Sequence, residues 1–108
     1  KYGHRFGDEA LVKISQLIKV KFGDDSYRYG GDEFIIITRL KDDKIISRIK
    51  EINNGLATHF ENYGVSVTAG IYHVESGATE STIISKVDSA LYKAKNEQRG
   101  SYHIYEVN

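Results

Sequence analysis

Apolar residues recur at helical spacing in the first part of the chain, and this spacing predicts an amphipathic helix. Its apolar positions are Leu11, Ile14, Leu17, Ile18 and Phe22. Asp8 and Glu9 are expected to open this helix, because negative charge is favourable near a helix N-terminus. Gly23 is expected to close it, since glycine readily adopts the left-handed backbone found after many helices.

The same spacing predicts two further helices. The second extends from about Asp43 to Asn62, with Gly55 as a tolerated weak point. Its apolar stripe consists of Ile45, Ile49, Ile52, Leu56 and Phe60. The third begins near Thr79 or Ser81, residue types that favour a helix start. Its inward positions are Ile84, Val87, Leu91 and Ala94.

A β-hairpin is predicted between the first two helices. Ser26–Tyr29 and Glu33–Arg39 have the composition of strands, and Gly30 and Gly31 between them favour a tight turn. The uninterrupted apolar run Ile35–Ile37 predicts a strand that is buried on both faces, as in the interior of a sheet.

Two more strands complete the pattern. Tyr63–Val74 is predicted as a strand broken by Gly70, and Tyr102–Val107 as a half-exposed final strand. The order of elements is therefore helix, hairpin, helix, strand, helix, strand. Helices interleaved with strands in this way predict an α/β or α+β sandwich, in which helices cover a sheet.

Length and composition describe one soluble globular domain. The chain has 108 residues, of which 40% are hydrophobic and 28% charged. Fifteen basic residues balance fifteen acidic ones, which argues against a nucleic-acid or membrane-surface partner. The absence of cysteine excludes disulfides, thiolate metal sites and a cysteine nucleophile. Methionine is also absent, so we expect the chain to be part of a longer protein.

The predicted hairpin carries the strongest chemical signal. Gly30 and Gly31 allow the backbone to approach a ligand closely, since neither has a side chain. Asp32 and Glu33 follow directly, and carboxylate oxygens are the ligands that Mg²⁺ prefers beside a nucleotide phosphate. Taken alone, the same residues also fit an ordinary turn with two solvated acids.

The run Gly30-Gly31-Asp32-Glu33-Phe34 spells the motif that names the GGDEF family, whose active members are diguanylate cyclases. Other segments resemble the family in the same order and at the family's spacing: Lys1–Leu11, Val65–Ile71, and Val87–Lys95 with Arg99 four residues beyond it. The resemblance covers nearly all of the chain. It implies an α/β (α+β) sandwich similar to nucleotidyl cyclases, with a central, mainly antiparallel sheet covered by helices.

The resemblance implies roles for the hairpin residues. Gly30 and Gly31 would let the backbone lie against GTP. Asp32 would be a catalytic residue that binds Mg²⁺ or Mn²⁺, and Glu33 would be catalytic by supporting the metal and phosphate end of the site. An intact set of these residues favours an active enzyme.

Three residues outside the hairpin match substrate-binding positions of the family. Asp8 matches the position that accepts hydrogen bonds from the guanine edge. Lys95 and Arg99 match the cations that hold the β- and γ-phosphates, and at one helical turn apart they would share a face. Taken singly, each also fits a simpler explanation: an acid at a helix start, or basic residues at a helix end.

The implied activity is the condensation of two GTP molecules into cyclic di-GMP with release of two pyrophosphates. Because one domain holds one GTP, the reaction requires a second GGDEF domain, expected as a homodimer. A sensor or regulatory domain is expected in the same protein. The expected location is the cytoplasm, either free or as the cytoplasmic part of a membrane-bound sensor, without direct membrane contact. The alternatives are an inactive regulatory module that binds GTP or cyclic di-GMP, and a dimerisation module without nucleotide.

The chain departs from the family pattern at two places. The product-inhibition motif Arg-x-x-Asp appears here with Lys21 in place of arginine and Asp24 retained, so weak or absent inhibition by cyclic di-GMP is expected. The family's first strand, with a second metal-binding Asp, would precede Lys1. We therefore expect residues 1–108 to form a single GGDEF domain that lacks this strand and is inactive by itself.

Overall fold

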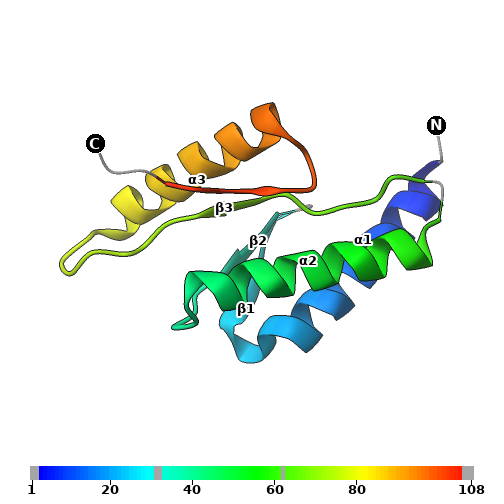
Figure 1. Cartoon of the computed structure of the whole chain (residues 1–108), viewed down its shortest axis with the longest axis horizontal. Helices are drawn as coiled ribbons and strands as arrows, with labels where there is room; N and C mark the ends of the chain where they lie inside the picture. Colours follow the sequence, from blue (N-terminus) through cyan, green and yellow to red (C-terminus); the bar gives the residue numbers. More distant parts are fainter. Residues whose placement is uncertain (1–2, 31–32, 62, 106–108) are drawn as a thin grey trace. The chain divides into compact units, whose positions relative to one another are not determined.

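The computed structural model describes residues 3–30, 33–61 and 63–105. The chain divides into two compact units, Lys1–Val65 and Ser66–Asn108. Figure 1 shows the elements in chain order: α1 (Gly3–Phe22), the 3₁₀ helix η1 (Gly23–Asp25), β1 (Ser26–Gly30), β2 (Glu33–Ile36), α2 (Asp42–His59), β3 (Ala69–Ile71), α3 (Glu80–Glu97) and β4 (Tyr102–Ile104).

The core of the first unit lies between α1 and α2, which pack against each other (Figure 1). Its buried side chains are Ile18, Phe22, Ile49, Ile52, Leu56 and Phe60. All of them belong to the two apolar stripes that the sequence predicts. Gly55 lies at the helix contact, where a Cβ atom would be 3.3 Å from Leu17 Cδ1. The missing side chain therefore lets α1 and α2 approach closely.

The start of α1 differs from the prediction. The helix begins at Gly3 rather than at Asp8 and Glu9, which lie more than one turn further along it. Phe6 explains the extension, because its ring lies 5.5 Å from that of Phe60 and 4.9 Å from that of Tyr63. Packing against these aromatic rings outweighs the weak helix propensity of the glycine-rich start. The predicted end is confirmed, since Gly23 follows the helix with φ 58°.

The predicted hairpin is present as β1 and β2, which pair antiparallel. The prediction that Ile35–Ile37 are buried on both faces is wrong. Ile35 and Ile36 are half-buried, and Ile37 is 68% exposed. β2 ends at Ile36, earlier than predicted, and in the described residues it pairs with β1 alone. A two-stranded hairpin is a small sheet of two edge strands, and such strands are covered less completely than the inner strand of a large sheet.

The second unit places α3 against a parallel pair of strands, β3 and β4 (Figure 1). The prediction that Gly70 breaks a strand is wrong. Gly70 lies at the centre of the short strand β3. A Cβ atom at Gly70 would lie 2.3 Å from the amide nitrogen of Leu91 and 2.8 Å from the carbonyl oxygen of Val87. Glycine is therefore required because the backbone of α3 lies directly on the strand.

Different contacts stabilise the start of α3 and a position further along it. Thr79, one of the two predicted starting residues, is the N-cap, and its hydroxyl accepts a hydrogen bond from the Thr82 amide. Further along, the Lys86 ammonium donates to the Tyr105 hydroxyl at 3.2 Å and lies 5.9 Å from the centre of the Tyr72 ring. The hydrogen bond to Tyr105 raises the pKa of Lys86 and outweighs the opposing effect of desolvation.

Helices and strands together make this an α+β fold, the class that the element order predicts. The described strands pair in two separate two-stranded sheets, antiparallel for β1–β2 and parallel for β3–β4. The last predicted strand is shorter than expected and ends at Ile104; residues 106–108 lie outside the described part of the chain.

Candidate functional site

The hairpin between β1 and β2 holds the residues of the predicted phosphate and metal site. Gly30 ends β1 and is paired with Glu33, the first residue of β2. The register is irregular between Arg28 and Gly30, so the ladder is distorted next to the tip. Glu33 is exposed, which leaves its carboxylate available to a ligand. Gly31 and Asp32 lie outside the described residues.

One face of the hairpin carries a cation that the prediction did not use. Arg28 is paired with Phe34 across the ladder, and its guanidinium carbon lies 5.9 Å from the centre of the Phe34 ring. This contact gives a cation–π attraction that orients Arg28 along the hairpin. The phenylalanine of the motif thus has a packing role within the hairpin.

Asp8 lies on α1, in the same unit as the hairpin. Its side chain is exposed, as a residue that accepts hydrogen bonds from a base requires. Because Asp8 is more than one turn inside the helix, the simpler explanation of an acid that opens the helix no longer applies.

Lys95 lies in the last turn of α3 and Arg99 lies just after the helix, both in the second unit, and both are exposed. The prediction that one helical turn separates them is wrong, because α3 ends at Glu97. Gln98 has an extended backbone with φ −166° and ψ 114°, so Arg99 belongs to the turn that leads to β4. Their relative placement is therefore set by that turn and not by the helical repeat.

The residues of the degenerate inhibitory motif are both ion-paired within the first unit. Lys21 Nζ lies 3.3 Å from Glu51 Oε1, and Lys19 Nζ lies 3.1 Å from Asp24 Oδ1. The Lys21 pair is the more sheltered of the two, since the Lys21 side chain is 30% exposed and that of Asp24 is fully exposed. A ligand at this position has to compete with Glu51 for the lysine.

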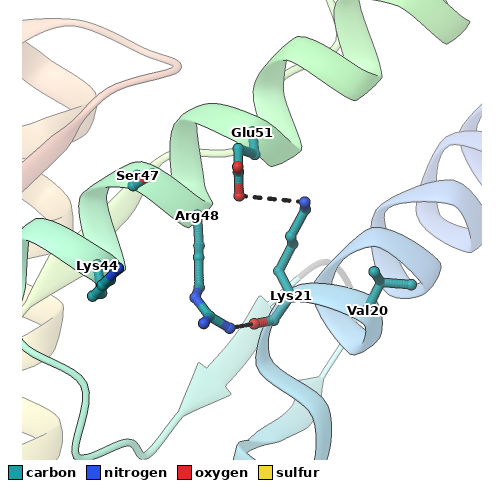
Figure 2. A pocket seen from close by; sticks show the side chains of 6 residues that line it. All are labelled: Val20, Lys21, Lys44, Ser47, Arg48 and Glu51. Carbon is teal, nitrogen blue, oxygen red and sulfur yellow. Dashed lines mark hydrogen bonds and ion pairs between the residues drawn. The ribbon is translucent and has the colours of Figure 1, made fainter.

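A depression of about 330 Å³ lies around Lys21, and Figure 2 shows the side chains that line it. It is lined by Val20, Lys21, Lys44, Ser47, Arg48 and Glu51. Arg48 extends from α2 and donates a hydrogen bond to the main-chain carbonyl of Lys21, while Lys21 extends towards Glu51 (Figure 2). Three cations and one carboxylate make this depression electropositive, which suits an anionic ligand.

Sequence reasoning missed Lys44 and Arg48 as neighbours of Lys21. Their four-residue spacing places them on one face of α2, and that signal is visible in the sequence. Their proximity to Lys21 depends on the packing of α1 against α2, and Arg48 is 27 positions away in the chain. No local pattern reports a contact of this kind.

Metal-ligand geometry is absent from the described part of the chain. In residues 3–30, 33–61 and 63–105, no three His, Cys, Asp or Glu side chains gather in a group that could hold a metal ion. Glu33 alone supplies a described carboxylate at the hairpin, and carboxylate oxygens fit Mg²⁺, which commonly completes its shell with phosphate oxygens and water. Across the same residues, no helix is long and apolar enough to cross a membrane.

An α+β fold with the sequence Gly-Gly-Asp-Glu-Phe at the junction of two antiparallel strands is typical of nucleotidyl-cyclase-like domains. The profile of one family, described as "Diguanylate cyclase, GGDEF domain", matches residues 1–101. The chain therefore belongs to the GGDEF domain family, and the resemblance read from the motifs is confirmed.

Several curated relatives share this family. The chain is 29% identical to diguanylate cyclase DgcS of Shewanella oneidensis, over 96% of this chain and 36% of the relative. It is 33% identical to the probable diguanylate cyclase DgcI of Escherichia coli, over 91% of this chain and 22% of the relative. A third relative, from Pseudomonas aeruginosa, is the bifunctional diguanylate cyclase/cyclic di-GMP phosphodiesterase MucR, with 27% identity over 97% of this chain and 16% of the relative.

The fold agrees with a solved structure of the same family. The active GGEEF domain of a diguanylate cyclase from Vibrio cholerae matches with a TM-score of 0.79 and 29% identity, over 99% of this chain and 73% of that chain. This match confirms the predicted fold class. The chain spans about a third of the length of the first of the curated relatives and less of the other two, which are thus longer proteins with further segments.

Proposed function

We propose that the full-length protein is a diguanylate cyclase that condenses two GTP molecules into cyclic di-GMP and two pyrophosphates. The observation that carries this proposal is the family match over residues 1–101 together with an unbroken Gly-Gly-Asp-Glu-Phe motif at the β1–β2 hairpin. Because the match spans both compact units, we also propose that they constitute one GGDEF domain.

In the proposed reaction, the 3′-hydroxyl oxygen of each GTP forms a bond to the α-phosphorus of the other. The bond between that phosphorus and the oxygen of the pyrophosphate leaving group breaks, and the hydroxyl proton is released to solvent. Two domains, each with one GTP, have to face each other, and a homodimer with two-fold symmetry provides this arrangement. The protein contributes mainly by positioning the substrates and stabilising charge.

The hairpin would bind the phosphates. Gly30 and Gly31 offer main-chain N–H groups without side chains in the way, and the exposed Glu33 supports the phosphate end of the site. Asp32 would hold Mg²⁺ or Mn²⁺ together with phosphate oxygens and water. When bound, such a cation neutralises charge on the α-phosphate and the pyrophosphate.

The remaining site residues would bind the two ends of GTP. Asp8 accepts hydrogen bonds from the ring and amino N–H groups of guanine, which adenine does not present in the same arrangement. Lys95 and Arg99 hold the β- and γ-phosphates, and arginine can use two parallel donors for one phosphate.

A direct product assay tests the activity. The full-length protein is incubated with GTP and Mg²⁺, and the nucleotides are separated by chromatography. The expected result is cyclic di-GMP with two pyrophosphates for each molecule formed, and no cyclic product from ATP. GTP that stays intact although it binds would contradict the cyclase and favour a regulatory module that binds GTP or cyclic di-GMP.

The electropositive depression around Lys21 supports regulation by a nucleotide as a second function. Lysine provides a point charge where the family motif has a planar guanidinium. The Lys21 ammonium is already ion-paired with Glu51. We therefore propose that the depression, together with Asp24 of the same motif, binds cyclic di-GMP weakly and that product inhibition is weak in this protein.

Lys21→Arg is expected to strengthen inhibition by cyclic di-GMP, because arginine can add a second hydrogen bond to the ligand. One charge-assisted hydrogen bond contributes about 1.5–3 kcal/mol, so the inhibitory concentration should fall about tenfold or more. Initial rates at increasing cyclic di-GMP measure the effect. Lys50→Arg, the same type of substitution at an exposed position of α2, is the matched control. Strong inhibition of the unaltered protein would contradict the proposal.

The partners and location follow the same family reasoning. We propose GTP as substrate, a second GGDEF domain as partner, and a sensor or regulatory domain in the same protein, in line with the greater length of the curated relatives. The proposed location is the cytoplasm. Balanced charge, with fifteen basic and fifteen acidic residues, supports the expectation of no nucleic-acid partner and no direct membrane contact.

A further inference from the structure

The turn between α3 and β4 decides where Arg99 lies. The helix ends at Glu97, Gln98 is extended, and Gly100 has φ 81°, in the left-handed region that favours glycine. Arg99 therefore stands between an extended residue and a left-handed one. Whatever holds this turn in place also holds the backbone from which the Arg99 side chain extends.

The segment before β3 makes contacts with this turn. The Gly100 amide donates a hydrogen bond of 2.9 Å to Thr68 Oγ1. The Ala69 amide donates one of 3.0 Å to the Ser101 carbonyl. At Gly100, a Cβ atom would lie 3.0 Å from Ser66 Oγ, so the turn packs closely on this segment. The Thr68 contact is made by a side chain, and it meets the residue directly after Arg99.

The two elements on either side of the turn are tied together as well. Glu97 Oε1, at the end of α3, lies 2.9 Å from His103 Nδ1 on β4, and the His103 side chain is 15% exposed. The turn thus spans two anchored ends, and the Thr68 hydroxyl supports it between them. A short loop that is held at both ends and in its middle has little freedom to move its side chains.

We propose that Thr68 is a positioning residue for the β- and γ-phosphates of GTP and that it acts through Arg99. This inference rests on the proposed function, in which Arg99 binds those phosphates. Thr68 suits the role because it is half-buried and because its branched Cβ restricts χ1, which keeps the hydroxyl acceptor in one place.

Thr68→Val keeps the shape of the side chain and removes the acceptor, so the Gly100 amide loses this partner and the turn relaxes. Displacement of a binding group weakens the contacts that it makes with the substrate. Arg99 would bind the phosphates in the ground state and in the transition state alike. We therefore expect KM for GTP to rise about tenfold while kcat changes less than about threefold.

The test compares Thr68→Val, Thr68→Ser, Arg99→Ala and the double variant Thr68→Val/Arg99→Ala in the full-length protein. KM and kcat are measured with GTP, and calorimetry gives Kd for GTP and for GMP, which lacks the β- and γ-phosphates. The expected result is weaker GTP binding with unchanged GMP binding, rescue by serine, and no further loss in the double variant. Thr58→Val is the matched control, because the Thr58 hydroxyl donates a hydrogen bond within α2, to the Asn54 carbonyl.

Several results would overturn the inference. A purely structural role would weaken GMP and GTP binding equally, or make the Thr68 and Arg99 losses additive, or leave serine as poor as valine. If Arg99→Ala weakens GTP binding and Thr68→Val does not, the positioning role fails and the proposed function stands. If Arg99→Ala has no effect on GTP binding, the proposed role of Arg99 fails together with the inference. If Thr68→Val does not fold, Thr68→Ala replaces it in the same comparison.

Discussion

Replacement of Asp32 by alanine is expected to abolish the formation of cyclic di-GMP by the full-length protein while leaving the domain folded. The change removes the carboxylate proposed to bind the metal, and Mg²⁺ depends on such oxygen ligands. Metal-ion catalysis contributes several kcal/mol of transition-state stabilisation, so the rate should fall about 10³-fold or more. Chromatography of the reaction products measures the loss, and circular dichroism checks the fold.

Two further variants separate a metal role from a general loss of charge. Asp32→Asn keeps the size of the side chain and removes the negative charge, and it should be nearly as inactive as the alanine variant. Asp43→Ala removes an exposed acid from the first turn of α2 and should keep activity within about twofold. Most of the activity surviving in Asp32→Ala would refute the metal role of this residue.

Gly70→Ala is expected to have the largest effect on stability. The added methyl carbon would lie 2.3 Å from the Leu91 amide nitrogen and 2.8 Å from the Val87 carbonyl oxygen, both backbone atoms of α3. A helix backbone cannot move aside as a flexible side chain can, so α3 has to shift away from β3. We place the loss at the upper end of overpacking effects, about 3 kcal/mol or more.

Thermal denaturation measures this loss, and a fall in Tm of about 12–24 °C is expected. Hydrogen–deuterium exchange of peptides from α3 should show lost protection, because the helix can no longer pack on the strand. Gly7→Ala is the control: nothing lies within 4 Å of the added carbon, and the site is helical. That variant should be stabilised by about 0.5–1 kcal/mol. An unchanged Tm for Gly70→Ala would contradict the close approach of α3 to β3.

Much of the fold follows from local patterns in the chain. The apolar stripes of the first two helices correctly give the buried positions of the first unit, and the cap of α3 is Thr79, one of the two residues predicted to begin it. Helical spacing and capping involve neighbours within a few residues, so the sequence displays them directly. The hairpin and the family motif at its tip are local in the same sense.

Contacts between distant segments account for the errors. Phe6 extends α1 to Gly3 because two aromatic rings from the residues that follow α2 pack on the Phe6 ring. The sequence predicts a strand break at Gly70. Only the position of α3 shows that a side chain there would have no space. Strand length and burial depend on which strands pair, which the composition of a single strand does not specify.

The sequence by itself determined the family, the α+β class and the identity of the residues proposed to bind GTP, because these depend on residue types in a fixed order. Tertiary structure alone decided that Arg99 leaves the helix that carries Lys95, and that Thr68 supports its turn from 32 positions away. It also decided that Arg48 joins Lys21 in one depression. Each of these depends on where the chain reverses and on which backbone groups then meet, and no periodicity in the sequence records that.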